Sequence, residues 1–313
     1  MLEDLLKSGS CFKLVCGAGN EEVEEIRRLV YLYALSGCKF FDLNANIEVI
    51  NAAKEALKLA EIDDAYFCVS LGIKGDPHNN KAVINYDKCV NCGSCESICP
   101  EKAIHYAKIK TSKCIGCSKC AKICPRGAIS YISQDKKFEE ILPQIIKSGI
   151  DCIEFHVIGQ DEDEIFSKWK YLNENFDGIL SICTCRTKLS DEGLIERISK
   201  MLESRKPYTT IIQADGFPMS GGDDTFKSTL QAVATAEIVH NEKLPVYLML
   251  SGGTNTKTAE LAKLCQIPYN GIAVGSYARK IVRKYIERPD FWENQRIIDE
   301  ALDAAKLLLE SAV

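Results

Sequence analysis

Eight of the chain's sixteen cysteines follow one spacing pattern that occurs twice. The first copy is Cys89-x2-Cys92-x2-Cys95-x3-Cys99-Pro100, and the second is Cys114-x2-Cys117-x2-Cys120-x3-Cys124-Pro125. Two-residue gaps allow three thiolates to surround one corner of a cubane cluster. Zinc sites with four cysteines usually consist of two separated CxxC pairs, and a disulfide framework is the other alternative. The spacing therefore favours iron–sulfur chemistry.

The same spacing occurs in bacterial two-cluster ferredoxins, in which the fourth cysteine of each run ligates the other cluster. We therefore expect two [4Fe–4S] clusters with crossed ligand sets, one on Cys89, Cys92, Cys95 and Cys124 and the other on Cys99, Cys114, Cys117 and Cys120. Short apolar segments that favour strands follow both Cys-Pro pairs, at residues 103–106 and 128–131. Residues 85–132 are predicted to form a ferredoxin-like domain that folds poorly without iron and sulfide.

Polar residues also interrupt apolar, strand-like segments elsewhere in the chain. The candidate catalytic residues among them are Lys13, Asp42, Asn44, Glu154, His156, Gln213 and Asp215. Six of these form pairs spaced two residues apart, so each pair lies on one face of its strand. Ionisable groups are rare in buried strands unless they are paired or functional. The set therefore either serves a polar ligand or acid–base chemistry, or forms an internal ion-pair network of Lys13 with Asp42 or Glu154.

Outside the cysteine-rich region, short apolar segments alternate with amphipathic helical patterns. The predicted strands lie at residues 12–18, 40–45, 66–71, 152–158, 179–185, 209–214, 246–250 and 271–274. Near-continuous apolar strands separated by helices indicate a parallel sheet. Eight strand–helix units favour an α/β fold, a (β/α)8 TIM-like barrel, and a doubly wound open sheet is the alternative.

The predicted domains follow from this pattern. Residues 1–84 form the first part of the barrel, residues 85–132 are the inserted 2[4Fe–4S] ferredoxin-like domain, and residues 133–313 complete the barrel. The insertion occupies the third loop that leads from a strand to a helix. Such loops lie at the carboxyl ends of the barrel strands, where barrel enzymes keep their active sites.

Glycine-rich turns after the last two predicted strands suggest a phosphate site. The candidate cofactor-binding residues are Gly252, Gly253, Gly275 and Ser276. Barrels often bind phosphate in these two loops, where backbone N–H groups reach the oxygens, so FMN is a possible cofactor. The alternative is that the glycines only make tight turns. The irregular loop at residues 215–224 is predicted to be a lid or ligand loop, or else a long surface loop.

Composition narrows the class of protein. The formal net charge is −5 and no basic run is present, so no nucleic-acid partner is expected. No apolar stretch is long enough to span a membrane, and the N-terminus does not have the pattern of a signal peptide. The cysteines outside the two runs have no framework spacing, which suits a reducing cytosol: Cys11, Cys16, Cys38, Cys68, Cys152, Cys183, Cys185 and Cys265. We expect a cytoplasmic, oxygen-sensitive protein.

Motifs spread over nearly the whole chain resemble the light-dependent period protein family (LdpA), known as iron–sulfur redox-sensing proteins of cyanobacteria. Besides the double cysteine run, they are the segments at residues 12–18 (FKLVCGA), 213–221 (QADGFPMSG), 251–255 (SGGTN) and 275–279 (GSYAR). The resemblance implies two [4Fe–4S] clusters on the eight cysteines and a role in reporting cellular redox state. It implies no catalytic residues.

Two functions are compatible with these features. The first is an iron–sulfur protein for electron transfer or redox sensing, with a redox partner protein or a small-molecule electron carrier. The second is an oxidoreductase whose clusters feed electrons to FMN or another phosphorylated ligand at the barrel mouth. The sequence does not decide whether the chain is an enzyme.

Overall fold

The structure, a computed structural model, describes residues 1–73, 76, 79–134, 137–157, 161–187, 189–216 and 223–312. Within these residues eight parallel strands close into a barrel in the order β1-β12-β11-β10-β9-β8-β3-β2. The strands are β1 (Cys11–Val15), β2 (Phe40–Asn44), β3 (Tyr66–Gly72), β8 (Cys152–His156), β9 (Ile179–Cys185), β10 (Thr210–Asp215), β11 (Tyr247–Ser251) and β12 (Gly271–Val274). The predicted (β/α)8 barrel is confirmed.

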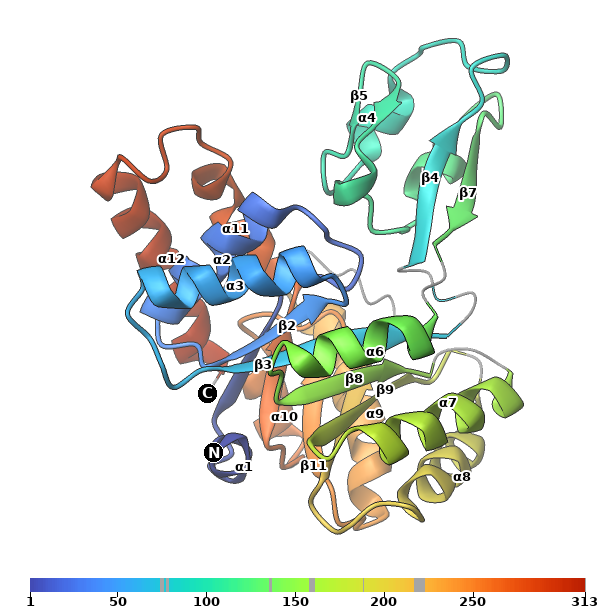
Figure 1. The fold of residues 1–313 in the computed structure, drawn as a ribbon, viewed down its shortest axis with the longest axis vertical. Coiled ribbons are helices and arrows are strands. Elements are labelled where there is room, and N and C mark those ends of the chain that lie inside the picture. Colours follow the sequence, from blue (N-terminus) through green and yellow to red (C-terminus); the bar gives the residue numbers. More distant parts are fainter. Residues whose placement is uncertain are drawn as a thin grey trace.

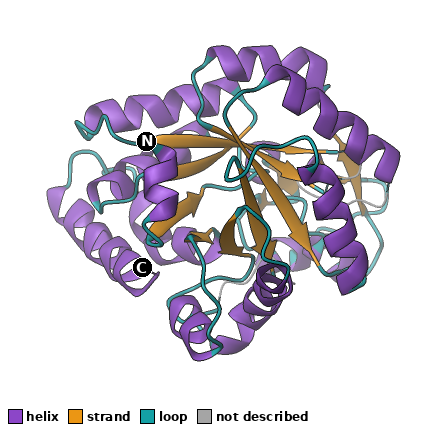
Figure 2. Cartoon of the chain, turned by 90° about the horizontal axis from the view of Figure 1, so that it is seen from below, coloured by secondary structure: helices purple, strands orange, loops and turns teal. Residues whose placement is uncertain are grey.

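Helices surround the barrel on its outside (Figure 2). They are α2 (Val23–Leu35), α3 (Ile47–Leu59), α6 (Phe138–Lys147), α7 (Glu162–Asn175), α8 (Asp191–Leu202), α9 (Phe226–Asn241), α10 (Thr258–Leu264), α11 (Ser276–Ile286) and α12 (Gln295–Ala312). Side chains at the starts of α3, α7, α8 and α9 accept a hydrogen bond from a backbone N–H of the first turn, which fixes where each helix begins. None of the described helices is long and apolar enough to cross a membrane.

A short N-terminal helix, α1 (Leu2–Lys7), closes the bottom of the barrel. Leu2 and Leu6 are buried against side chains from the first residues of the strands, including Cys11, Phe40 and Cys152. This helix is not predictable from the sequence pattern, because six residues are too few for a clear helical period. Its effect is to exclude water from the lower barrel interior, so that the polar side chains above it lie in a low-dielectric environment.

The cysteine-rich insertion leaves the barrel after β3 and returns at α6, as predicted (Figure 1). It contains β4 (Asn80–Ile84), α4 (Ser94–Ile98), β5 (Ile104–His105), β6 (Lys108–Ile109), a 3-10 turn (Thr111–Lys113), α5 (Lys119–Ile123) and β7 (Ile129–Ser133). Antiparallel pairing joins β4 to β7 and β5 to β6. The predicted range of 85–132 is too narrow, because β4 lies wholly before residue 85 and β7 ends one residue after 132.

Candidate functional site

Each of two cavities in the insertion is lined by four cysteines. The first is lined by Cys89, Cys92, Cys95 and Cys124. The second is lined by Cys99, Cys114, Cys117 and Cys120. The fourth cysteine of each run therefore lies with the first three of the other run, in the crossed arrangement that the spacing predicts. The assignment of these residues as ligands stays a prediction.

The backbone around the cavities suits a negatively charged group. Asn91 and Gly93 flank Cys92 with positive φ angles of 51° and 75°, and Gly116 and Ser118 flank Cys117 in the same way with 68° and 63°. Successive N–H groups in such alternating conformations form concavities that bind anions, including iron–sulfur clusters. Backbone N–H groups also donate to cysteine sulfurs, from Ala128 to Cys124 Sγ and from Ala103 to Cys99 Sγ, both at 3.2 Å. The donor set fits a thiolate-ligated [4Fe–4S] cluster.

The two cavities differ in their exposure. We call the cavity with Cys92 the outer cavity, because the Cys92 side chain is exposed. In the inner cavity Cys114 and Cys120 are buried, and the Tyr131 hydroxyl lies 3.2 Å from Cys120 Sγ. The inner cavity is also lined by Glu101 and Lys113, which contact the barrel.

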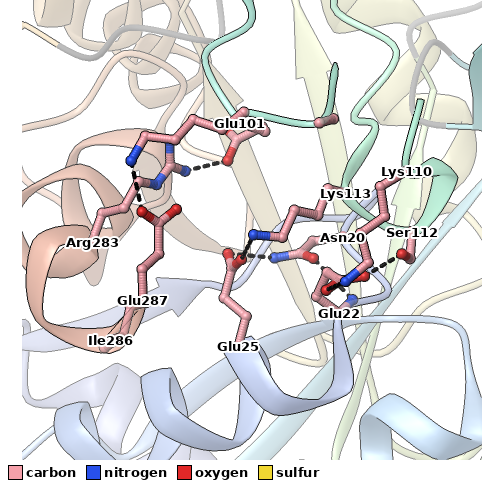
Figure 3. Close-up of polar contacts among 12 residues, drawn as sticks. Asn20, Glu22, Glu25, Glu101, Lys110, Ser112, Lys113, Arg283, Ile286 and Glu287 are labelled. Carbon is pink, nitrogen blue, oxygen red and sulfur yellow. Dashed lines mark hydrogen bonds and ion pairs between the residues drawn. The ribbon is translucent and has the colours of Figure 1, made fainter. Parts of the chain in front are cut away.

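Polar contacts hold the side of the inner cavity against α2 and the loop that precedes it (Figure 3). Glu22 accepts hydrogen bonds from Lys110 and Ser112, and Lys113 Nζ lies 3.7 Å from a Glu25 carboxylate oxygen. Beside them Lys81, which is buried, donates to the carbonyl oxygens of Gly19 at 2.8 Å and Cys114 at 2.9 Å. The insertion is thus fixed to the barrel on one face.

A second group of contacts links the Cys-Pro pair of the inner cavity to the barrel strands. Arg283 of α11 donates to the Pro100 carbonyl and to Glu101 (Figure 3). Arg279, which is buried, lies 3.5 Å from the other Glu101 oxygen and donates to the Val15 carbonyl at the end of β1 at 2.9 Å. Burial raises the pKa of Glu101, but Arg279 and Arg283 outweigh it, so the pKa is lowered and Glu101 is ionised.

Sequence reasoning did not identify this contact. Arg279 appeared only as part of a family motif, and Glu101 and Arg283 were not singled out. Two signals are visible in the sequence. One is the acidic Glu101 directly after a Cys-Pro pair, and the other is the pair of arginines Arg279 and Arg283, one helical turn apart. Nothing in the sequence alone indicates that the two segments meet.

Inside the barrel, Lys13 lies at the centre of a buried polar network. Its ammonium donates to Glu154 and, at 3.0 Å, to Gln213 Oε1, and lies 3.6 Å from Asp42 Oδ2. Gln213 Nε2 donates in turn to Glu154 Oε1 at 2.9 Å, and Ser70 donates to Asp42 at 2.7 Å. Both ion pairs considered for the lysine are present.

Burial and the neighbouring charges shift the pKa values of the network's ionisable groups in opposite directions. Burial alone lowers the pKa of Lys13, but Asp42 and Glu154 raise it well above its usual value. Burial raises the pKa of Asp42 to about 6, against the effect of Lys13. Burial also raises the pKa of Glu154, but here the effects of Lys13 and His156 are larger and lower the pKa to about 2. Lys13 and Glu154 form a fully ionised buried pair.

The network continues upward to the mouth through His156. Its Nε2 lies 3.1 Å from Glu154 Oε1, and its Nδ1 lies 2.8 Å from Asp76 Oδ2. Gly72 makes room for Asp76, since a Cβ at position 72 would lie 1.8 Å from Asp76 Oδ2. Cys183 donates to Asp215 Oδ2 at 2.8 Å. Sequence reasoning missed Asp76 because it lies beyond the end of β3, outside any strand pattern.

Six of the seven candidate catalytic residues thus lie in one buried region of the barrel interior. The seventh, Asn44, donates a hydrogen bond to the Ala18 carbonyl. The structure therefore brings together most of the residues that strand alternation selected. Their catalytic role stays a prediction.

At two of the candidate phosphate-binding positions, close packing accounts for the presence of glycine. A Cβ on Gly252 would lie 2.5 Å from the backbone nitrogen of Gly216, and one on Gly275 would lie 3.2 Å from Val15 Cβ. Gly253 has a φ of +81°, which a side chain would strain, and Ser276 is the first residue of α11. Most of the predicted lid loop, residues 217–222, lies outside the described residues.

Comparison with known proteins agrees with this organisation. The 4Fe-4S binding domain matches residues 82–105 and 107–130, and the light dependent period A C-terminal domain matches residues 144–313. Light dependent period A of Synechococcus elongatus is 30% identical over 99% of this chain and 90% of its own length. The chain belongs to the light dependent period A family. The two matches to the 4Fe-4S binding domain cover the segments whose cysteines line the two cavities.

Two solved structures similar to this family member have low sequence identity to it. Tryptophan synthase from M. tuberculosis is 11% identical, with a TM-score of 0.49 and coverage of 98% of this chain and 97% of its own. The YdjI aldolase from Escherichia coli K12 is 7% identical, with a TM-score of 0.49 and coverage of 98% and 92%.

Proposed function

We propose that this chain is a redox sensor that takes up electrons in its insertion and reports its redox state through the barrel. The observation that carries the proposal is the chain of contacts from Cys99 of the inner cavity through Glu101 and Arg279 to the Val15 carbonyl at the end of β1. A bound [4Fe–4S] cluster supplies reversible one-electron chemistry. The electron donor is a redox partner protein or a small one-electron carrier.

The exposed side of the outer cavity suits the entry of electrons. Cys92 is exposed there, and the Val90 side chain is 59% exposed beside it. An apolar surface next to a redox centre allows a partner to approach closely, and redox encounters use small interfaces. The inner cavity has its tighter contacts on the barrel side, so an electron held there adds negative charge beside Glu101, Arg279 and Arg283.

That added charge is expected to weaken the ion pairs of Glu101 with Arg279 and Arg283. The attraction of the two arginines for Glu101 is strong because the group is largely buried. A further negative charge in the inner cavity competes for the same arginines and repels the Glu101 carboxylate. The hydrogen bond from Arg279 to Val15 carries this change into the barrel mouth.

Hydrogen exchange of the oxidised and dithionite-reduced protein, both kept without oxygen, tests this account. In the native protein, reduction is expected to change amide protection at least twofold in the first turns of α11 and around Val15. Arg283→Met should remove most of that difference, because it loses the contacts with Pro100 and Glu101. Arg288→Met removes an exposed pair with Asp290 instead and should leave the difference unchanged. Equal protection in both redox states would exclude signalling by this route.

The alternative function is an oxidoreductase with FMN at the barrel mouth. It is favoured by the buried polar network below the mouth and by the position of the insertion above it. Mass spectrometry of the small molecules released on denaturation separates the two functions, because an FMN-dependent enzyme releases FMN and the sensor releases none.

A further inference from the structure

The upper barrel interior carries more negative than positive groups. Among the residues that the structure describes, the carboxyl groups of Asp42, Asp76, Glu154 and Asp215 are buried there with Lys13 and His156. Even with the histidine protonated, full ionisation of the carboxyl groups leaves a net negative charge. Buried charges are stable only when they are compensated or bound to a metal. For the described side chains of this region, a bound cation would therefore balance the charge.

Three side chains in this region have the arrangement of metal ligands. Single ligand atoms of Glu154, His156 and Cys183 all lie within 4.8 Å of one another, and all three residues are buried. His156 and Cys183 are register partners on the neighbouring strands β8 and β9, which makes their positions rigid. A carboxylate oxygen, an imidazole nitrogen and a thiolate sulfur are together the ligand types of zinc.

An independent observation comes from Asp215. Its Oδ2 accepts the Cys183 thiol at 2.8 Å, so the carboxylate lies against one of the three residues. Its Oδ1 is buried and accepts no hydrogen bond within the part of the chain that the structure describes. A buried carboxylate oxygen without a donor is costly. Its contact with Cys183 makes Asp215 the candidate for a fourth ligand.

The histidine also has the support that metal-bound histidines have. Asp76 Oδ2 lies 2.8 Å from His156 Nδ1, which leaves Nε2 on the side of Glu154. A carboxylate on the second ring nitrogen fixes the tautomer and the ring orientation of a ligating histidine. Gly72 permits this contact, because any side chain there would displace Asp76.

We propose that the barrel binds one divalent zinc-type cation through Glu154, His156 Nε2, Cys183 and Asp215, with Asp76 as the positioning residue of the histidine. On binding, the proton of the Cys183 thiol and any imidazolium proton of His156 are released to solvent, and the contact between Glu154 and His156 is replaced by bonds to the cation. A second group of possible ligands, Asp42, Cys68 and Glu154, is less suitable because the Lys13 ammonium lies against both of its carboxylates. In the proposed site Lys13 contacts only Glu154, through Oε2, and the other oxygen, Oε1, lies beside His156.

The test uses full-length protein with its clusters intact, isolated without oxygen and washed with a chelator. Titration with Zn²⁺ against a chromophoric chelator is expected to show one tight site per chain, with unchanged iron content. X-ray absorption at the zinc edge should give one sulfur at about 2.3 Å with nitrogen and oxygen at about 2.0–2.2 Å. Four sulfur ligands would instead place zinc in the cysteine runs of the insertion and overturn the proposal, as would the absence of tight binding.

Variants separate ligands from packing residues. Cys183→Ala is expected to weaken zinc binding at least 100-fold, and Asp76→Asn about 10- to 100-fold, as for other residues that orient a metal ligand. Cys38→Ser is the matched control, because Cys38 is equally buried but only donates to backbone carbonyls. Equal zinc affinity in Cys183→Ala and Cys38→Ser would contradict the site, and the absorption spectrum of the native protein decides it if a variant fails to fold.

Discussion

Cys92→Ala is expected to lower the iron content from about eight to about four irons per chain, because it removes one ligand of one [4Fe–4S] cluster. Cys117→Ala should cause a loss of the same size from the other cavity. Iron and sulfide analysis of protein purified without oxygen measures both losses. Cys265→Ala is the control, since Cys265 is exposed on the barrel and lies outside both cavities.

The crossed arrangement gives this prediction a sharper form. Cys124 shares the outer cavity with Cys92, and Cys99 shares the inner cavity with Cys117. Cys124→Ala should therefore abolish the same electron paramagnetic resonance signal as Cys92→Ala, and Cys99→Ala the same signal as Cys117→Ala. If Cys99→Ala and Cys92→Ala removed the same signal, each run would hold its own cluster and the crossed assignment would be wrong.

Lys13→Met is expected to reduce the free energy of unfolding by about 3–5 kcal/mol, because it leaves buried carboxylates without their cation. Lys13 is fully buried and contacts both Asp42 and Glu154. Lys39→Met, which breaks an exposed pair with Asp64, is expected to cost about 1 kcal/mol or less. Denaturant unfolding followed by far-ultraviolet circular dichroism, with clusters intact, compares the two variants.

The pH dependence of the Lys13→Met defect follows from Asp42. Burial gives this carboxyl a pKa of about 6 in the folded protein, above the usual value of 3.8. Because its pKa is higher in the folded protein, Asp42 binds a proton more tightly there than in the unfolded protein. The protein therefore loses stability as the pH rises from the pKa of Asp42 in the unfolded protein to its pKa in the folded protein. Without Lys13 the Asp42 pKa rises further, so the defect should shrink when the pH is lowered from 7.5 to 5.5. A defect that is equal at both pH values would contradict the role of Asp42, and a defect no larger than that of Lys39→Met would show that the network does not depend on Lys13.

The sequence was most informative where a chemical requirement fixes residue spacing. Two-residue gaps between cysteines are set by the size of a cluster, so the grouping of Cys89, Cys92 and Cys95 is visible without coordinates. Barrel strands are buried on both faces, which makes their apolar runs and intervening helices readable. For the same reason, polar residues such as Lys13 and Glu154 stood out against their strands.

The remaining features depend on contacts between distant segments. Asp76 reaches His156 from a loop, and only the absence of a side chain at Gly72 allows it. The pairing of Glu101 with Arg279 requires the insertion to rest on α11, which no local pattern encodes. In the sequence, Cys183 is one of the cysteines without framework spacing. Only its hydrogen bond to Asp215 in the structure makes it a candidate metal ligand.

The most direct test of the central claim is a reductive titration of the anaerobic protein, followed by electron paramagnetic resonance. The account predicts reversible uptake of about two electrons per chain and signals of two [4Fe–4S] clusters, each abolished by replacing a cysteine of its own cavity. Protein that carries its full iron content yet takes up no electrons, or gives the signal of one cluster that all eight cysteines share, would contradict it.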